Sequence, residues 1–341
     1  MANYNAGAMT RRYAPLVAAI ETVGLTKHYG RRALPVHPPF VHPTGLVRAL
    51  DDLTIDVREG EVFGFLGPNG AGKSTMIRTL LGFLHPTAGR AQVLGLDVVR
   101  KSVEIRRRVG YLPGGVALHD SLSGEDQLDY MAALSSRPPV RRADLTDRLE
   151  LPERTLKRRV RDYSRGMRQK IGIVQALQHD PELAILDEPT EGLDPLMQRA
   201  FYEILDDLQA AGRTVFFSSH VLSEVERVCD RVAIIRSGRL VALEEIDTLL
   251  AHRKRDVEMR VAGGLPVLAG VPGVTAIVEM DGRLTCHVEG DMGPFMRAIA
   301  GFPITDLTIE PAHLEEAFLE YYEDAEANAP GPAVARQREA G

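Results

Sequence analysis

The chain has 341 residues, of which 44% are hydrophobic and 26% are charged, and its formal net charge is −6. From this composition we expect a soluble, intracellular protein, and the length suits one domain of roughly 230 residues with a smaller one beside it. No apolar run approaches the roughly 18 residues that a membrane-spanning helix needs. Cys229 and Cys286 match no metal-ligand spacing, so we expect both to be small buried residues.

The first fifty residues combine one expected strand with two irregular segments. We expect residues 1–17 to form a flexible N-terminal extension. The mild apolar run at 14–20 is too short for the core of a signal peptide, and Pro15 interrupts it. A strand ending near Tyr29 follows. Residues 34–45 then hold four prolines together with His37 and His42. A plain surface insertion is favoured there over a metal site.

A glycine-rich segment follows two short strands that we expect at 53–57 and 61–66. It fits the pattern of Gly, four residues, then Gly-Lys-Ser, in which backbone N–H groups turn inward around phosphate oxygens. The helix expected at 73–83 points its N-terminus at the anion. Lys73 would reach the β- and γ-phosphates of a nucleoside triphosphate, and the Ser74 hydroxyl would ligate Mg²⁺. The predicted phosphate-binding residues are Gly67, Pro68, Asn69, Gly70, Ala71, Gly72, Lys73, Ser74 and Thr75.

A strand expected at 109–113 precedes a mostly helical stretch at 124–180. Within that stretch Ser164 stands at the N-cap position of an apolar helix, whose exposed N–H groups suit an anion. Residues 137–170 also carry twelve Lys or Arg and five Asp or Glu. A solvated helix surface is the favoured interpretation of this charge, and contact with anionic headgroups, a partner protein or the triphosphate stays open.

Two carboxylates end the apolar run at 183–186. Such a run is typical of a parallel strand buried on both faces, and ligands bind at the carboxyl ends of these strands. We expect Asp187 to hold Mg²⁺ and Glu188 to act as general base for the attacking water. The elements expected next are a helix at 195–212, a strand at 214–217, a helix at 221–229 and strands at 231–237 and 239–243.

Taken in order, these motifs resemble the ATP-binding-cassette (ABC) ATPase family over about residues 20–250. The family's signature Leu-Ser-Gly-Gly-Gln appears here as Tyr-Ser-Arg-Gly-Met, which keeps Ser164 and Gly166, the two residues that a γ-phosphate contact needs. The resemblance implies an α/β P-loop NTPase fold, with an ABC-type nucleotide-binding domain at 18–252 and a helical subdomain at about 116–180.

The resemblance also implies roles for three further residues. Tyr29 would stack on adenine, and Asp194 would lie in the loop that crosses the dimer interface. His220 would contact the γ-phosphate and orient the attacking water. One family residue is missing, because Gly114 occupies the position of a Gln that helps to hold Mg²⁺ and water and to sense the partner. His119 or Asp120 could substitute for it.

After about residue 253 the pattern changes to a small α+β domain, expected at 253–323. Strand-like runs at 276–280 and 284–288 surround an Asp-Gly hairpin signal, and a helix at 292–300 and a strand at 304–309 follow. The expected last helix, at 314–322, resembles the C-terminal helix of drug and polyketide exporter ATPases. Residues 324–341 are expected to be disordered.

The resemblance as a whole implies an ATP-hydrolysing subunit of an ABC transporter, with ATP and Mg²⁺ as cofactors. Two copies would form a homodimer and drive export through a separate integral-membrane permease subunit, at the cytoplasmic face of the cell membrane. An importer ATPase with a regulatory C-terminal domain is the alternative, followed by a soluble ABC ATPase of repair or translation. Nucleic-acid binding is disfavoured by the acidic total charge and the lack of interleaved aromatic residues.

Overall fold

The computed structural model describes residues 18–30, 47–135, 137–251, 254–280 and 282–310. Among these residues no helix is long and apolar enough to cross a membrane. Four expectations lie outside the described residues: the extension 1–17, the Pro-rich insertion 34–45, the helix 314–322 and the tail 324–341.

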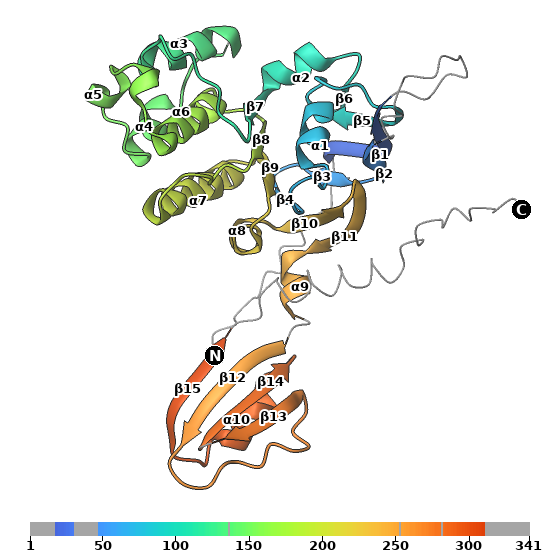
Figure 1. The fold of residues 1–341 in the computed structure, drawn as a ribbon, viewed down its shortest axis with the longest axis vertical. Coiled ribbons are helices and arrows are strands. Elements are labelled where there is room, and N and C mark those ends of the chain that lie inside the picture. The colour runs from blue at the N-terminus through green and yellow to red at the C-terminus, as the bar shows by residue number, and fades with distance from the viewer. Residues whose placement is uncertain (1–17, 31–46, 136, 252–253, 281, 311–341) are drawn as a thin grey trace, which may run out of the picture.

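The central layer is a six-stranded sheet in the order β11-β10-β4-β9-β8-β7 (Figure 1). All neighbouring strands are parallel except β10 and β11. The carboxyl ends of the parallel strands therefore meet at one edge, where an open α/β sheet places its ligands. The strands are β4 (Val62–Leu66), β7 (Val109–Leu112), β8 (Leu183–Asp187), β9 (Thr214–Ser219), β10 (Arg231–Arg236) and β11 (Arg239–Glu245).

Both faces of this sheet are covered, which explains why its strands read as continuous apolar runs. Side chains alternate between the two faces of a strand. In β4, Val62 and Leu66 therefore belong to one hydrophobic core, whereas Phe63 and Phe65 belong to another. The first core is closed by α6 (Arg165–Leu177), α7 (Pro195–Ala210) and α8 (Leu222–Val228), and the second by α1 (Lys73–Leu80) and the antiparallel sheet.

The antiparallel sheet corrects the strand that we expected at 53–57. The chain leaves one strand at Leu53 and enters the next at Asp56, because it turns around a buried side chain: Thr22 Oγ1 donates to Leu53 O at 3.1 Å and accepts from Ile55 N at 3.0 Å. The sheet has the order β2-β1-β5-β6, with β3 also paired to β1. Its strands are β1 (Ala18–Tyr29), β2 (Val47–Leu53), β3 (Asp56–Arg58), β5 (Ala88–Val93) and β6 (Leu96–Asp97).

A group of helices stands beyond the edge strand β7, as Figure 1 shows. Apolar side chains of these helices, among them Leu128 and Leu145, extend the first hydrophobic core outward. The remaining helices are α2 (Ser102–Arg108), α3 (Gly124–Ser135), α4 (Arg142–Arg148), α5 (Glu153–Leu156) and α9 (Ile246–Ala251).

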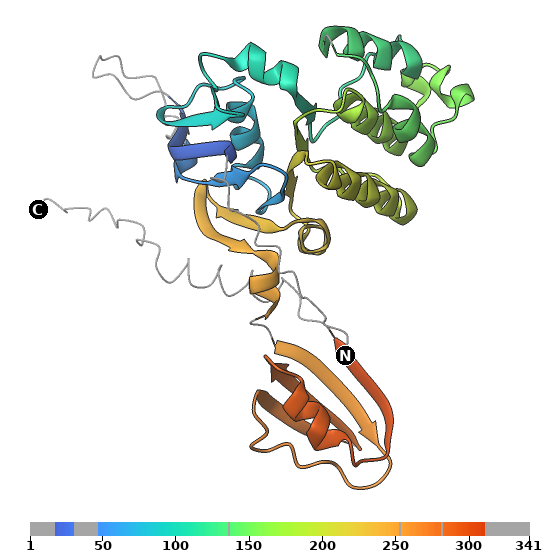
Figure 2. The ribbon, with the colours of Figure 1, turned by 180° about the vertical axis from the view of Figure 1, so that it is seen from behind.

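The C-terminal part forms a separate antiparallel sheet in the order β13-β14-β12-β15, with one helix against one face (Figures 1 and 2). Phe295 and Ile299 of the helix pack on Met259, Leu284 and Cys286 of the sheet. Both cysteines are buried and free, as expected. The elements are β12 (Lys254–Val261), β13 (Val274–Met280), β14 (Arg283–Glu289), α10 (Gly293–Ile299) and β15 (Ile304–Glu310).

Candidate functional site

The glycine-rich segment forms the expected strand–loop–helix unit between β4 and α1. Gly72 closes the loop with a φ of 114°, and a Cβ at this position would lie 2.4 Å from the Ala49 carbonyl oxygen. Only glycine fits both the left-handed backbone and this close approach. The first turn of α1 therefore begins directly at the loop, with its free N–H groups available to an anion.

Lys73 places a positive charge at the centre of this loop. Its side chain is 6% exposed, and its ammonium donates to the Gly67 carbonyl oxygen at 2.6 Å. The same ammonium lies 3.1 Å from Glu188 Oε1, although this ion pair lacks hydrogen-bond geometry. A buried cation with a strong loop contact is well placed to oppose the charge of a phosphate.

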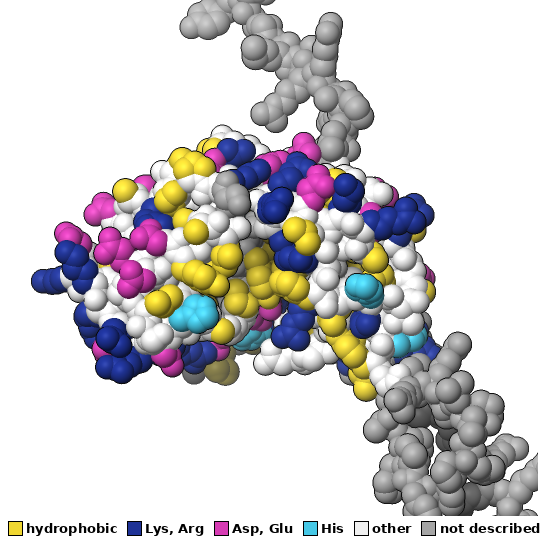
Figure 3. Space-filling view, turned by 90° about the horizontal axis from the view of Figure 1, so that it is seen from above, with side chains coloured by type: hydrophobic (Ala, Val, Ile, Leu, Met, Phe, Trp, Pro, Cys, Tyr) yellow, Lys and Arg dark blue, Asp and Glu magenta, His cyan; other side chains and the backbone are white. Residues whose placement is uncertain are grey.

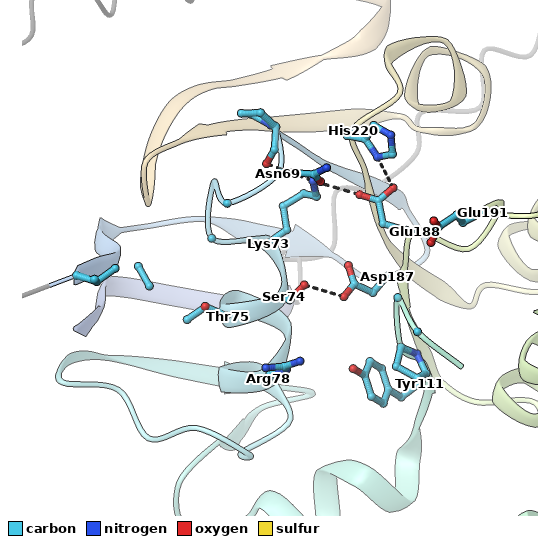
Figure 4. Close-up of a pocket in the computed structure, with 18 of the residues that line it drawn as sticks. Asn69, Lys73, Ser74, Thr75, Arg78, Tyr111, Asp187, Glu188, Glu191 and His220 are labelled. Carbon is cyan, nitrogen blue, oxygen red and sulfur yellow. Dashed lines mark hydrogen bonds and ion pairs between the residues drawn. The ribbon is translucent and has the colours of Figure 1, made fainter. Parts of the chain in front are cut away.

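Asp187 is held at the end of β8 by two hydroxyl groups. Ser74 Oγ donates to Asp187 Oδ2 at 3.0 Å (Figure 4). Ser218 Oγ, at the end of β9, donates to Oδ1 at 2.5 Å. Hydroxyl and carboxylate oxygens are the ligands that Mg²⁺ prefers in proteins. The donor set present here therefore fits a magnesium ion.

Glu188 leaves the strand in a left-handed conformation, with a φ of 50°. Consecutive side chains of a regular strand point to opposite faces, so without this turn Glu188 would point away from the pocket that Asp187 faces. The turn brings both carboxylates into one pocket, where Glu188 Oε2 lies 2.8 Å from His220 Nδ1 (Figure 4). Left-handed backbone in a non-glycine residue is strained, and such strain clusters at functional sites.

These groups line one pocket of about 580 Å³. Most of the residues that the sequence predicted for phosphate, metal and water lie in its wall, although they come from segments more than a hundred positions apart. The predicted residues in the wall are Pro68, Asn69, Gly70, Gly72, Lys73, Ser74, Thr75, Asp187, Glu188 and His220.

Other predicted residues lie outside this wall. Gly67 and Ala71 belong to the loop but do not face the pocket. Tyr29 is 39% exposed at the end of β1, and Val47, its partner in β2, lines the pocket in its place. Ser164, Gly166 and Asp194 are also outside the wall.

The signature segment instead packs against the loop that follows Glu188 in the same chain. Ser164 is the N-cap of α6, as predicted, and its side chain accepts from Met167 N at 3.2 Å. Arg165 forms an ion pair with Glu191, and a Cβ on Gly166 would lie 2.8 Å from the Gly192 carbonyl oxygen.

Asp194, at the end of that loop, caps α7 by accepting from Leu196 N at 3.1 Å and Met197 N at 3.0 Å. The residue predicted to lie in an interface loop therefore also fixes the start of a helix within its own chain.

Gly114 lies beside Asp187, the carboxylate predicted to hold Mg²⁺. A Cβ added to Gly114 would stand 3.3 Å from Asp187 Oδ2, so a longer side chain here would begin beside the predicted metal site. Neither His119 nor Asp120, the two residues that could substitute for the missing Gln, lines the pocket. His119 packs against Tyr130, and Asp120 pairs with Arg168 at 2.8 Å.

Four polar residues in the pocket wall escaped the sequence analysis: Arg48, Arg78, Tyr111 and Glu191. The sequence could have predicted Arg78 as a pocket residue, because it lies one helical turn after Ser74 on α1 and so shares its face. Arg48 and Tyr111 enter from other strands, and their positions depend on sheet pairing.

Comparison with known proteins identifies the family. The family model for ABC transporters matches residues 50–191. An uncharacterized ABC transporter ATP-binding protein of Nostoc sp. is 37% identical over 280 residues, which cover 80% of this chain and 83% of that protein. The chain belongs to the ABC transporter ATP-binding proteins.

A second relative and a solved structure support this assignment. A daunorubicin resistance ATP-binding protein of Streptomyces coeruleorubidus is 36% identical over 287 residues, covering 80% of this chain and 90% of that protein. A solved ATP-binding subunit of an ABC transporter superposes with a TM-score of 0.59 at 30% identity, covering 68% of this chain and 91% of that chain. The expected fold is confirmed, and the chain is an ATP-binding, ATP-hydrolysing ABC subunit.

Proposed function

We propose that two copies of this chain bind and hydrolyse MgATP between them and so drive export through a membrane permease. The observation that supports it best is the single pocket that unites Lys73, Ser74, Asp187, Glu188 and His220. It combines a cation for phosphate, oxygen ligands for a metal, and a carboxylate–histidine pair for water. Phosphoryl transfer depends mainly on such positioning and charge stabilisation.

In this proposal, Ser74 and Asp187 would hold Mg²⁺, which would neutralise charge on the phosphates. Lys73 contacts the phosphates and releases its ion pair with Glu188. Glu188 then accepts the proton of the attacking water, while His220 orients the carboxylate through their 2.8 Å contact. Each of these groups already lies in the pocket, so chemistry needs little reorganisation of the chain.

The signature residues supply the argument for a second copy. Ser164 and Gly166 lie outside the pocket of their own chain, yet α6 offers free N–H groups at this point. We propose that they face the γ-phosphate bound by the other copy. Two head-to-tail copies related by a two-fold axis would complete two equal sites.

The permease would dock in an apolar groove of about 510 Å³ that adjoins the nucleotide pocket at Tyr111 and Pro113. Phe83, Val103 and Leu134 line it with more than half of their surface exposed. Figure 3 shows hydrophobic side chains gathered in this hollow between the helical part and the rest of the molecule. Arg106 and Arg107 stand among them. The occupant that fits is a cytoplasmic segment of the permease with an apolar face and acidic neighbours.

Export as the direction of transport is supported by the daunorubicin resistance relative, since resistance to a drug is consistent with its removal from the cell. The same proposal puts this chain at the cytoplasmic face of the membrane, where ATP is available. The cargo would contact the permease.

The test of this proposal is Glu188→Gln. The amide keeps the shape but cannot accept a proton, and loss of a general base costs about 10²–10⁴ in rate. We expect the variant to bind ATP and to form a stable dimer in size-exclusion chromatography with ATP and Mg²⁺. Glu203→Gln, on the exposed face of α7, is the control and should behave as wild type. A Glu188→Gln protein that hydrolyses ATP at the wild-type rate, or stays monomeric where wild type dimerises, would contradict the proposal.

A further inference from the structure

Tyr111 of β7 lies in the wall between the two cavities. Together with Pro113, its side chain lines both the nucleotide pocket and the apolar groove. A ligand in either cavity therefore contacts the same side chain.

On the pocket side, the Tyr111 hydroxyl points into the space between α1 and β8 (Figure 4). Burial raises the pKa of this phenol, the nearby negative charge of Asp187 raises it further, and the positive charge of Arg78 lowers it by less. Within the described part of the chain this hydroxyl has no hydrogen-bond partner. A phenol can donate a hydrogen bond, and a hydrogen bond to a carboxylate or to a metal-bound water would be stabilising.

On the groove side, the ring of Tyr111 contacts Phe83 with a centroid distance of 6.2 Å. Phe83 in turn carries the Arg106 guanidinium over its ring, at 5.2 Å from the centroid. Phe83 and Arg106 are themselves groove residues. A segment that enters the groove would press on this stack, and the stack ends at Tyr111.

The position where the family has its sensing Gln offers nothing comparable, since Gly114 has no side chain. His119 and Asp120 are engaged elsewhere and do not line the pocket. Of the described residues, only Tyr111 and Pro113 face both cavities, and only the tyrosine has a side-chain donor.

We infer that Tyr111 performs the task left open at Gly114: its hydroxyl positions Asp187 and the metal-bound water, and its ring senses the occupant of the groove. This inference rests on the proposed function, because it assumes both MgATP in the pocket and a permease in the groove. Tyr111 acts here as a positioning residue and does not itself take part in proton transfer.

The experiment uses Tyr111→Phe in the full-length chain, which removes one oxygen and keeps the ring. Binding of a fluorescent, non-hydrolysable ATP analogue is titrated with Mg²⁺. We expect the apparent Mg²⁺ affinity to fall by about 3- to 10-fold, in line with the loss of one hydrogen bond to a charged group. Analogue binding without Mg²⁺ should stay unchanged, and stimulation of ATPase activity by the permease should fall. Tyr130→Phe, a tyrosine outside both cavities, is the matched control.

A second experiment tests whether the Mg²⁺ affinity of Tyr111→Phe can be restored. Adding Gly114→Gln to Tyr111→Phe should restore the Mg²⁺ affinity, whereas adding Gly114→Ala, which brings the same Cβ without an amide, should not. Three outcomes would overturn the inference about Tyr111 alone. They are equal rescue by Gly114→Ala, an unchanged Mg²⁺ affinity in Tyr111→Phe, and a loss of analogue binding by Tyr111→Phe when Mg²⁺ is absent. A wild-type protein that binds no MgATP would instead overturn the proposed function and this inference with it.

Discussion

The nucleotide pocket and the apolar groove share Tyr111 and Pro113 as a common wall, yet they are built differently. The pocket is built around the glycine-rich loop and the ends of β2, β7, β8 and β9, and its polar groups are held by hydrogen bonds such as Ser74 to Asp187. The groove is lined mainly by apolar side chains from the end of α1 and from α2, β7, α3 and α6, and a hydrogen bond from Arg106 to the Leu81 carbonyl oxygen at 2.8 Å joins two of these elements.

This difference separates chemistry from recognition. A pre-positioned polar site lowers the cost of reaching the transition state, so it must be rigid before the ligand arrives. An apolar surface gains its free energy only when a partner covers it, and it tolerates changes of shape. Substitutions in the pocket should therefore abolish activity, whereas substitutions in the groove should uncouple it.

Lys73→Ala is expected to have the largest effect. It removes the charge that opposes the phosphates, and the loss of charge-assisted hydrogen bonds should weaken ATP binding by about 100-fold or more. Calorimetric titration with ATP measures this directly, and circular dichroism should show a retained fold. Lys101→Ala, which removes an exposed lysine paired with Glu104, should bind ATP as wild type does. Normal ATPase activity in Lys73→Ala would mean that the pocket is not the nucleotide site.

Leu134→Glu should weaken docking of the permease in the groove and leave the nucleotide pocket unchanged. A buried charge in the docked complex would weaken permease binding by about 10-fold or more, because an unpaired charge at an apolar interface is costly. Basal ATPase activity without the permease should stay at the wild-type level. Val140→Glu adds the same charge to another exposed apolar position outside the groove and should not affect docking. Equal docking of both variants would show that the permease uses another surface.

Glu182→Gln changes an ion-pair cluster that lines neither cavity, and it should have the smallest effect. Glu182 bonds to Arg108 at 3.2 Å and to Arg137 at 3.0 Å, and the Arg108 hydrogen bond holds its pKa down at about 2. Because its folded-state pKa is depressed, its stabilisation is present above about pH 4.5 and is lost as the pH falls toward 2. Since the group is partly exposed, we expect a loss of only about 1 kcal/mol at pH 7.

Urea unfolding at pH 7 and pH 3 measures this difference in stability. It should narrow at pH 3, because there the unfolded chain binds a proton at this carboxyl, whose ordinary pKa is 4.5, whereas the folded chain, with a pKa of about 2, remains mostly ionised. Glu104→Gln, at an exposed pair, should change stability at neither pH. A difference between Glu182→Gln and wild type that is the same at both pH values would argue against an electrostatic origin.

The sequence predicted the pocket well because its groups lie in short contiguous segments. Glycine spacing implies a loop, an apolar run implies a buried strand, and the residue after such a strand falls at the ligand edge. The capping role of Ser164 followed from local spacing in the same way. None of these predictions requires knowledge of distant contacts.

The groove and its link to the pocket could not be predicted in this way. Phe83 and Leu134 look like ordinary helix-end and helix residues until the sheet and helices bring them together. Tyr111 depends on the pairing of β7 with β8, and the break of the strand expected at 53–57 depends on the buried hydroxyl of Thr22. Each of these features follows from tertiary packing, which a local pattern does not contain.

At Glu188, the residue that would favour the stability of the fold differs from the residue that ATP hydrolysis needs. Glycine occupies a φ of 50° without the steric penalty that glutamate carries there. Variants selected only for heat tolerance would therefore drift toward glycine at this point and lose the carboxylate. An engineer who wants a more robust subunit should leave this residue alone and seek stabilising changes elsewhere, for example in the exposed faces of the helices.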